Sequence, residues 1–179
     1  VSMNSFQISG GKRLVGEVDV AGSKNTALAI LSAVVLTDGV TILHNVPEVS
    51  DTRIKGKLLE RFGAKVEWRE GSLFIDCSNI INGKADEEIV RSIRTSFYLL
   101  GPLLARIGQV TIPAPGGCKI GARPVDFHLK GLALLGADVS LEGGIYRAKA
   151  KKLTGAEIYL DFPSAGATQH LMATASLAE

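Results

Sequence analysis

The hydrophobic residues of this chain switch repeatedly between the two-residue repeat of strands and the helical repeat of three to four residues. Helical spacing predicts helices at about 23–35, 50–62, 86–102, 125–135 and 164–179. Alternation predicts strands at 6–9, 14–20, 40–43, 64–68, 73–77, 109–113, 137–141, 145–148 and 157–160. Helices and strands that alternate along a chain indicate the α/β class.

The ends of the predicted helices carry their own signals. Ser23 is the expected N-cap of the first helix, which places Lys24 and Asn25 in its first turn. A lysine there opposes the helix dipole but suits an anion bound by the exposed N–H groups, and a merely solvated lysine is the alternative. We expect Ser50 or Asp51 to cap the second helix. A kink is expected where Pro102 enters the third helix.

Two further helix features favour anions. Arg91 and Arg94 lie three residues apart and are expected to share one face of the third helix, where either could bind an anion or both could simply be solvated. The last helix begins within residues 164–168, which are small and leave its N–H groups open. It is expected to continue to Glu179 without a C-cap.

An internal repeat divides the chain into units. The run Leu59-x-x-Phe62-Gly63-Ala64-Lys65-Val66 recurs 73 residues later as Leu132-x-x-Leu135-Gly136-Ala137-Asp138-Val139. Each copy predicts a helix end that leads into a hairpin, within a unit of strand, helix, strand, helix, strand and strand. A third unit opens near Leu153 and breaks off. Because stacked repeats bury their apolar faces on one another, we expect the chain to be an incomplete domain.

Residues 113–124 follow neither repeat, because proline and glycine are too dense there, and so predict a long loop. The loop carries Cys118, with Lys119 and Arg123 nearby to stabilise a thiolate and make it reactive. A loop of this length is usually functional or disordered, and an incidental surface cysteine is the alternative. Cys77 instead falls in an alternating strand and is expected to pack in the core.

Composition narrows the classes of function. The 179 residues are 46% hydrophobic and 21% charged, as in ordinary soluble globular proteins. A net charge of +2 argues against nucleic acid or an anionic membrane as a partner. No apolar run approaches the ~18 residues of a membrane span, and residues 1–5 lack the basic and apolar regions of a signal peptide. Two distant cysteines make no disulfide framework, so a reducing cytoplasmic location is expected.

A metal ion or another cofactor is not expected. The three histidines include no pair at helical spacing, and Asp126 and His128 are two residues apart, so their side chains would leave a helix in different directions.

Several motifs together resemble one family, the UDP-N-acetylglucosamine 1-carboxyvinyltransferases, which are the bacterial enolpyruvyl transferases of peptidoglycan synthesis. The similarity runs from about Phe6 to Glu179, and the loop with its cysteine is the most specific part. The motifs are Gly22-Ser23-Lys24-Asn25, Arg94, Pro115-Gly116-Gly117-Cys118-x-Ile120-Gly121-Ala122-Arg123-Pro124-Val125-Asp126-x-His128 and Ser164-x-Gly166-Ala167-Thr168.

The resemblance implies an EPSP synthase-like fold of two inside-out α/β domains, each built from three β-α-β-α-β-β repeats, with the active site between them. Residues 1–21 would form strands that belong with the second domain. Residues 22–179 would make up most of the first domain. The remainder of the second domain would be absent from this chain.

The resemblance also implies transfer of enolpyruvate from phosphoenolpyruvate to the 3′-hydroxyl of UDP-N-acetylglucosamine, with loss of phosphate, by addition and elimination. By that analogy Cys118 would be catalytic and would protonate the methylene carbon of phosphoenolpyruvate. The residues that would bind phosphoenolpyruvate are Lys24, Asn25 and Arg123. The residues that would bind the sugar nucleotide are Arg94, Arg123, Pro124, Val125, Asp126, Phe127, Ser164, Ala165 and Gly166.

Physical chemistry supports this assignment in part. Phosphoenolpyruvate and a diphosphate need several converging cations, which Lys24, Arg94 and Arg123 could supply. Cations favour a thiolate, however, whereas a general acid must keep its proton until transfer, so the pKa of Cys118 should lie near the working pH.

The chain departs from the family in two respects. Some members carry a lysine in the segment where this chain has Asp161-Phe162-Pro163, which affects a contact with the nucleotide. The acid thought to take the sugar proton, and further arginines, belong to the other domain. The chain alone is therefore expected not to turn over.

Two alternatives stay open. A 5-enolpyruvylshikimate-3-phosphate synthase shares the Gly-Ser-Lys segment but usually continues with serine and lacks the cysteine loop, so Asn25 and Cys118 argue against it. The other alternative is a catalytically silent fragment that binds a UDP-sugar. The expected partners are small-molecule substrates in every case except a purely structural fragment.

Overall fold

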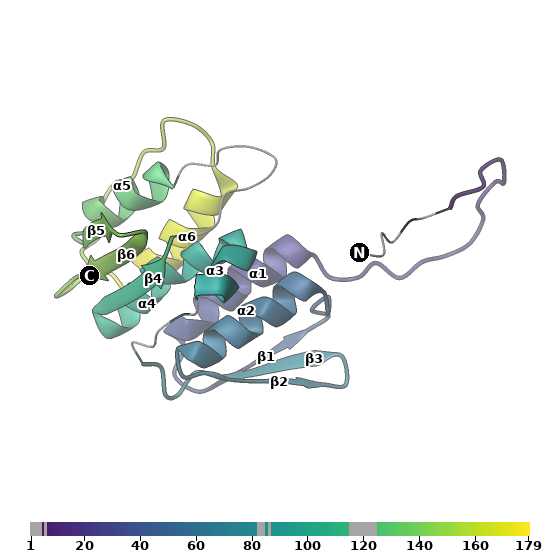
Figure 1. The fold of residues 1–179 in the computed structure, drawn as a ribbon, viewed down its shortest axis with the longest axis horizontal. Helices are drawn as coiled ribbons and strands as arrows, with labels where there is room; N and C mark the ends of the chain where they lie inside the picture. The colour runs from purple at the N-terminus through teal and green to yellow at the C-terminus, as the bar shows by residue number, and fades with distance from the viewer. Residues whose placement is uncertain (1–4, 6, 82–84, 86, 115–124) are drawn as a thin grey trace.

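The computed structural model describes residues 5, 7–81, 85, 87–114 and 125–179. Two small sheets lie at two sides of a group of helices, and an N-terminal arm extends away from this body (Figure 1). The first sheet contains β1 (Val40–His44), β2 (Lys65–Arg69) and β3 (Ser72–Asp76) in the order β1-β3-β2. The second contains β4 (Gln109–Pro113), β5 (Asp138–Glu142) and β6 (Ile145–Lys149) in the order β4-β6-β5.

The two sheets have the same topology, so the internal repeat is confirmed. In each sheet the last strand lies in the middle and is antiparallel to both neighbours. A helix, α2 (Ser50–Arg61) or α5 (Asp126–Leu134), connects the first strand to the second and packs against the second. The described residues of each unit form the α-β-α-β-β part of the expected β-α-β-α-β-β repeat.

The repeated sequence motif is the C-terminal end of these two helices. Gly63 and Gly136 follow α2 and α5 with φ of 93° and 88°, a backbone conformation that glycine adopts without strain. The next residue in each copy donates its N–H back into the helix, from Ala64 to the carbonyl of Leu59 at 3.2 Å and from Ala137 to that of Leu132 at 3.0 Å. The motif therefore ends the helix and turns the chain into the hairpin.

The remaining helices lie between the sheets. They are α1 (Lys24–Ala33) with the 3₁₀ turn η1 (Val34–Leu36), α3 (Glu87–Ser92), the 3₁₀ segment η2 (Arg94–Leu99), α4 (Leu100–Ile107) and α6 (Ala165–Ala175). Helix α6 packs against α1, α4 and α5. It approaches α5 at Gly131, where an added Cβ would lie 2.3 Å from a methyl carbon of Leu171.

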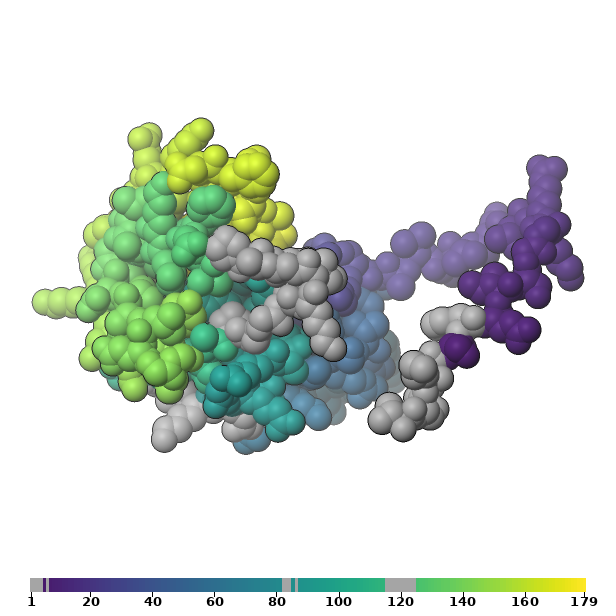
Figure 2. Space-filling view, turned by 45° about the horizontal axis from the view of Figure 1, so that its top comes forward, coloured from purple at the N-terminus to yellow at the C-terminus, as the bar shows by residue number. Residues whose placement is uncertain are grey.

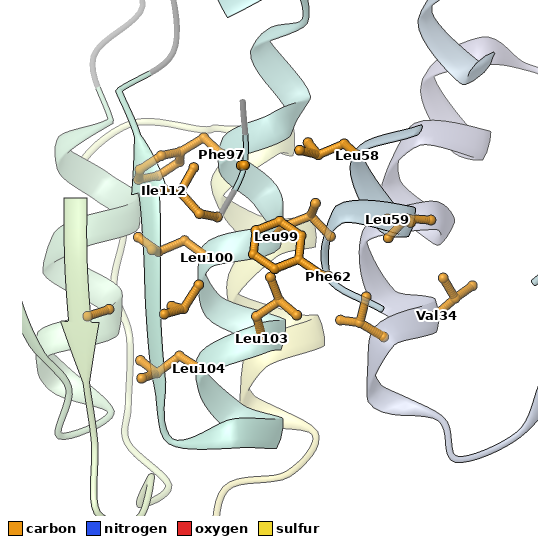
Figure 3. Packing of buried hydrophobic residues seen from close by; sticks show 14 of the residues in the cluster. Val34, Leu58, Leu59, Phe62, Phe97, Leu99, Leu100, Leu103, Leu104 and Ile112 are labelled. Atoms are coloured by element: carbon orange, nitrogen blue, oxygen red, sulfur yellow. The ribbon is translucent and has the colours of Figure 1, made fainter. Parts of the chain in front are cut away.

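One hydrophobic core joins the two units. Figure 3 shows side chains from η2 and α4 packed against side chains from α2 and η1, with Ile112 of β4 on the other side. Phe62, Phe97 and Leu103 are among its fully buried members, with 0–1% of their surface exposed. Because both units contribute to this core, they are expected to unfold together. Truncating one of its leucines to alanine typically costs about 2–5 kcal/mol.

The N-terminal strands predicted at 6–9 and 14–20 do not form among described residues 7–21. This arm lies away from the body (Figure 2), and its apolar side chains, including Leu14 and Val18, are 86–94% exposed. An isolated hairpin is marginal in water without a surface to pack on, which explains the difference. The strand predicted at 157–160 is also absent, because no neighbouring strand pairs with it.

Four predictions about helices need correction. The predicted third helix is divided into α3, η2 and α4, with the break at Ile93, whose φ of −130° and ψ of 125° are extended. Pro102 produces no break, since it lies in the first turn of α4, where a missing N–H costs little. Val49 is the N-cap of α2 in place of Ser50 or Asp51, and its N–H is bound by Thr52 Oγ1 at 3.2 Å. Helix α6 ends at Ala175, before Glu179.

Candidate functional site

A cleft of about 610 Å³ opens where the N-terminal ends of α1, η2, α5 and α6 meet. The start of α2 contributes Asp51 as well, so five separate parts of the chain supply its walls. Its lining residues are Lys24, Asn25, Leu28, Asp51, Ile93, Arg94, Thr95, Tyr98, Phe127, His128, Phe162, Pro163, Ser164, Ala165, Gly166 and Gln169.

The cleft brings together most of the described residues that the sequence nominated. Those that line it are Lys24, Asn25, Arg94, Phe127, Ser164, Ala165 and Gly166. Val125 and Asp126 are the N-cap and first residue of α5, directly before Phe127 of the cleft lining, and do not line it themselves. Cys118, Arg123 and Pro124 lie outside the described residues.

Lys24 is held at the start of α1. The predicted cap is confirmed, since Ser23 Oγ accepts the N–H of Thr26 at 3.3 Å. Lys24 Nζ lies 2.9 Å from a carboxylate oxygen of Asp51, in the first turn of α2. Both side chains are partly exposed, so the pair contributes at most about 1 kcal/mol. An anionic ligand of Lys24 would therefore compete with a weakly held carboxylate.

Arg94 reaches the cleft because the chain breaks at Ile93. The extended backbone there redirects the chain from α3 into η2. Arg91 stays on α3, where it pairs with Glu87 one turn away, and is not part of the cleft lining. The expectation that Arg91 and Arg94 share one helix face is therefore wrong, because it assumed a continuous helix.

The start of α6 forms the opposite wall. Ser164 is its N-cap and accepts the N–H of Ala167 at 3.2 Å. Gly166 follows, and an added Cβ there would lie 2.1 Å from the hydroxyl oxygen of Tyr98. Only glycine therefore lets Tyr98 of η2 approach the first turn of α6. The N–H groups and dipole at this helix start favour an anion in the cleft.

Two buried histidines lie together beside the cleft, and one of them, His128, lines it. His128 of α5 and His170 of α6 are 3% and 1% exposed, and their Nδ1 atoms are 3.0 Å apart. Burial, with the nearby Arg94 charge, lowers the pKa of His128 to about 4. Burial also holds the pKa of His170 well below its usual value. Both rings are therefore neutral near pH 7.

Lys55 supports the cleft from below. Its side chain is fully buried, and its Nζ donates to the carbonyl of Thr95, on the cleft wall, at 2.6 Å. Burial lowers the pKa of Lys55 well below its usual value, so the amine loses its charge more readily than an exposed lysine. The bond fastens η2 to α2 and so fixes the segment that carries Arg94.

Cys77 has the packing role that its strand pattern predicted. It is fully buried, and burial raises the pKa of its thiol to about 11, with the nearby Arg106 acting in the opposite direction. Arg106 donates to the Cys77 carbonyl at 2.8 Å and to that of Val35 at 2.8 Å. A thiol with so high a pKa is inert near neutral pH.

Sequence reasoning missed Asp51 and Tyr98 as cleft residues, and it missed His170 as the buried partner of His128. Tyr98 lies four residues after Arg94, a spacing that would place both on one helical face, and this was the available signal. Nothing local identified Asp51 as the partner of Lys24.

The described residues contain no group of three or more His, Cys, Asp or Glu side chains placed to hold a metal ion. No described helix has the length and apolarity to cross a membrane.

Repeated α/β units that meet at a cleft with cations and helix N-termini define an α/β protein suited to anionic ligands. The family model described as EPSP synthase (3-phosphoshikimate 1-carboxyvinyltransferase) matches residues 8–179. The chain belongs to this family.

Two curated relatives are about half identical in sequence to this chain. A UDP-N-acetylglucosamine 1-carboxyvinyltransferase of Gloeobacter violaceus is 50% identical over 175 residues, which are 97% of this chain and 38% of the relative. The enzyme of the same name from Desulforapulum autotrophicum is 48% identical over 99% of this chain and 42% of its own length. The chain thus spans about two fifths of the length of these relatives.

Solved structures share the fold. The enolpyruvyl transferase NikO of Streptomyces tendae superimposes with a TM-score of 0.75 at 21% identity, over 94% of this chain and 40% of that one. An EPSP synthase of Acinetobacter baumannii gives a TM-score of 0.71 at 19% identity, over 92% of this chain and 38% of that one. The EPSP synthase-like fold predicted from the sequence is therefore confirmed for an incomplete domain.

Proposed function

We propose that the protein containing this chain transfers the enolpyruvyl group of phosphoenolpyruvate to the 3′-hydroxyl of UDP-N-acetylglucosamine and releases inorganic phosphate. The observation that carries the proposal is the convergence of Lys24, Arg94 and the N-terminal end of α6 on one cleft. The relatives at 45–50% identity support UDP-N-acetylglucosamine over a shikimate phosphate as the acceptor. The reaction would serve peptidoglycan synthesis in the cytoplasm.

The two substrates would occupy different parts of the cleft. Lys24 and Asn25, at the start of α1, would bind phosphoenolpyruvate together with Arg123. The charge of Lys24 becomes available when the ligand displaces Asp51, an exchange of one anion for another that costs little. Trianionic phosphoenolpyruvate gains more from this cation than a single carboxylate does.

The sugar nucleotide would lie between η2 and α6. Arg94 would bind its diphosphate, and Phe127 offers an apolar surface on the same wall. The remaining proposed contacts are Arg123, Pro124, Val125, Asp126, Ser164, Ala165 and Gly166. Val125 and Asp126 would act from the start of α5, at the edge of the cleft. Phe162 lines the cleft within the segment where some members of the family would carry a lysine, so it would contribute contact area and no charge.

The chemistry would run by addition and elimination. Cys118 would donate a proton to the methylene carbon of phosphoenolpyruvate as the sugar hydroxyl oxygen adds to the adjacent carbon and loses its own proton to a base. Loss of a proton from the new methyl group and departure of phosphate would then restore the double bond in the product. The role of Cys118 is carried by the resemblance alone.

The base for the sugar hydroxyl would belong to a second domain, with which residues 1–21 would pack. The exposed apolar side chains of the arm, such as Leu14 and Val18, support this, since a strand needs a surface to bury them. The 179 residues by themselves are therefore expected to release no phosphate.

The test measures phosphate release by the intact protein with phosphoenolpyruvate and either UDP-N-acetylglucosamine or shikimate 3-phosphate. Arg94→Ala should lower kcat/KM about ten- to a hundredfold, because a charge-assisted hydrogen bond to the ligand is lost. Arg91→Ala is the matched control, since Arg91 is outside the cleft lining and ion-paired on α3, and should stay within about twofold. Turnover with shikimate 3-phosphate and none with UDP-N-acetylglucosamine would overturn the proposal.

A further inference from the structure

The buried histidine pair beneath the cleft has no part in the chemistry proposed above. His128 and His170 come from different helices, α5 and α6, and are joined by a single hydrogen bond between their Nδ1 atoms at 3.0 Å. One of the two nitrogens must donate and the other accept. The direction of this bond decides which nitrogen of His128 carries its proton.

Gly101 fixes that direction. Its backbone N–H donates to Nε2 of His170 at 2.9 Å, so this nitrogen must be an unprotonated acceptor. The ring of His170 is neutral in its buried site, and its one proton therefore lies on Nδ1. A Cβ at Gly101 would lie 2.7 Å from Nε2 and 2.0 Å from Thr174 Oγ1, so only glycine allows the contact.

The proton of His128 follows by elimination. His170 donates its Nδ1–H, so Nδ1 of His128 accepts, and the neutral His128 ring carries its proton on Nε2. Aromatic contacts hold the ring in place: the ring of Phe97 lies at 89° to it and that of Tyr98 is stacked at 28°, both 5.4 Å away between centroids. The result is an N–H bond of fixed position and direction.

That N–H borders the cleft. Within the described part of the chain, Thr95 Oγ1 is the one buried side-chain nitrogen or oxygen without a hydrogen-bond partner. None of the described residues is hydrogen-bonded to His128 Nε2, and His128 is one of the residues that line the cleft. A fixed N–H that faces the cleft from a side chain 97% buried is a preformed donor for an oxygen atom bound there.

We propose that His128 donates its Nε2–H to an oxygen acceptor of the sugar nucleotide, and that His170 is a positioning residue whose Nδ1–H holds His128 in that tautomer. The identity of the ligand rests on the proposed function. A neutral donor suits this place because Arg94 already supplies a cation nearby, and a second charge on His128 would be repelled by it. Among the described residues, Lys55 and Tyr98 are further titratable groups near the pair.

The tautomer can be measured without any ligand. Nitrogen NMR of the intact protein labelled at histidine should show Nδ1 of His128 as the unprotonated type and Nε2 as the protonated type, and the reverse for His170. In His170→Leu the signals of His128 should average between the two tautomers, because the fixed donor is gone. A proton on Nδ1 of His128 in the unmodified protein would overturn the inference.

Calorimetric titration with UDP-N-acetylglucosamine and with UDP tests the donor itself. His128→Leu should weaken binding about tenfold, and up to about a hundredfold if the acceptor is charged. His128→Gln is the matched variant, because its amide N–H reaches about as far as Nε2 does, and it should retain most of the affinity. His170→Asn should likewise restore most of what His170→Leu loses, since its amide N–H can replace Nδ1–H.

The titration results show which part of the ligand accepts the hydrogen bond, and they distinguish failure of this inference from failure of the proposed function. Loss with both ligands places the acceptor on the UDP group, and loss with UDP-N-acetylglucosamine alone places it on the sugar. Equal affinity of the unmodified protein and a folded His128→Leu overturns the inference, and so does His128→Gln as weak as His128→Leu. If the unmodified protein binds neither ligand, the proposed function fails, and the NMR result on the free protein still decides the donor assignment.

Discussion

Replacing Gly166 with alanine perturbs the contact that joins the start of α6 to Tyr98. The new Cβ would lie 2.1 Å from the Tyr98 hydroxyl oxygen, about 1.3 Å closer than ordinary van der Waals contact. Overpacking of this kind typically costs about 1–3 kcal/mol. Alanine recovers up to about 1 kcal/mol of that through its higher helix propensity, so we expect a net loss of about 1–2 kcal/mol.

The same overlap should reach the ligand. Either Tyr98 or the first turn of α6 must move by about 1 Å, and both line the cleft. We therefore expect the affinity for UDP-N-acetylglucosamine to fall about tenfold, the equivalent of one misaligned hydrogen bond. Urea unfolding of the intact protein and calorimetric titration measure the two effects separately.

A double-mutant cycle identifies the cause. Tyr98→Phe removes the hydroxyl, after which the nearest atom to the new Cβ is the ring carbon Cζ at 3.0 Å, a tight contact that small shifts can relieve. Gly166→Ala should therefore cost less in the Tyr98→Phe background, by about 1 kcal/mol. Gly155→Ala is the control, because its Cβ would meet only the Glu179 carbonyl oxygen at 3.7 Å. Gly166→Ala that behaves like Gly155→Ala would refute the reasoning.

Three further predictions concern buried titratable groups of the intact protein. The folded pKa of Lys55 is lowered, so the unfolded chain binds more protons than the folded one. The free energy of unfolding should therefore rise with pH, by about 1.4 kcal/mol per pH unit, up to about pH 10.4. Lys55→Met should remove this slope in denaturant titrations. Because the folded pKa values of His128 and His170 are lowered, the free energy of unfolding should fall as pH drops from 6.5 through about 4, by about 3 kcal/mol for His128 alone. A double variant, His128→Gln with His170→Asn, that unfolds in acid at the same midpoint pH as the unmodified protein would contradict this. Iodoacetamide at pH 7.5 should label Cys118 well before Cys77, whose thiol stays protonated with its pKa near 11, and mass spectrometry showing Cys77 labelled first would exclude that order.

Local sequence was sufficient for several of the elements and for some of their ends. Ser23 was identified as a helix cap from the residues around it, and the structure confirms the hydrogen bond that it makes. The repeat around Gly63 and Gly136 identified two helix ends and the hairpins after them, because a left-handed glycine and a back-donated N–H involve only neighbouring residues. The buried position of Cys77 followed from the alternation of its strand.

Local reasoning failed where pairing partners were needed. The arm at 7–21 alternates like a strand, yet it forms none among the described residues, because a strand depends on hydrogen bonds to another strand. The helix predicted across 86–102 breaks at Ile93, whose backbone is extended, so tertiary context overrides helix propensity there.

The cleft itself was decided by tertiary structure. A resemblance to known sequences could nominate Lys24, Arg94 and Ser164, but only the packing of α6 on the other helices brings these three, from distant parts of the chain, to one place. The pairing of Lys24 with Asp51 and the directed bond from His170 to His128 link residues 27 and 42 positions apart. No local pattern encodes such pairs, because hydrogen bonding and helix propensity act between near neighbours, whereas side-chain packing in the core sets which distant segments meet.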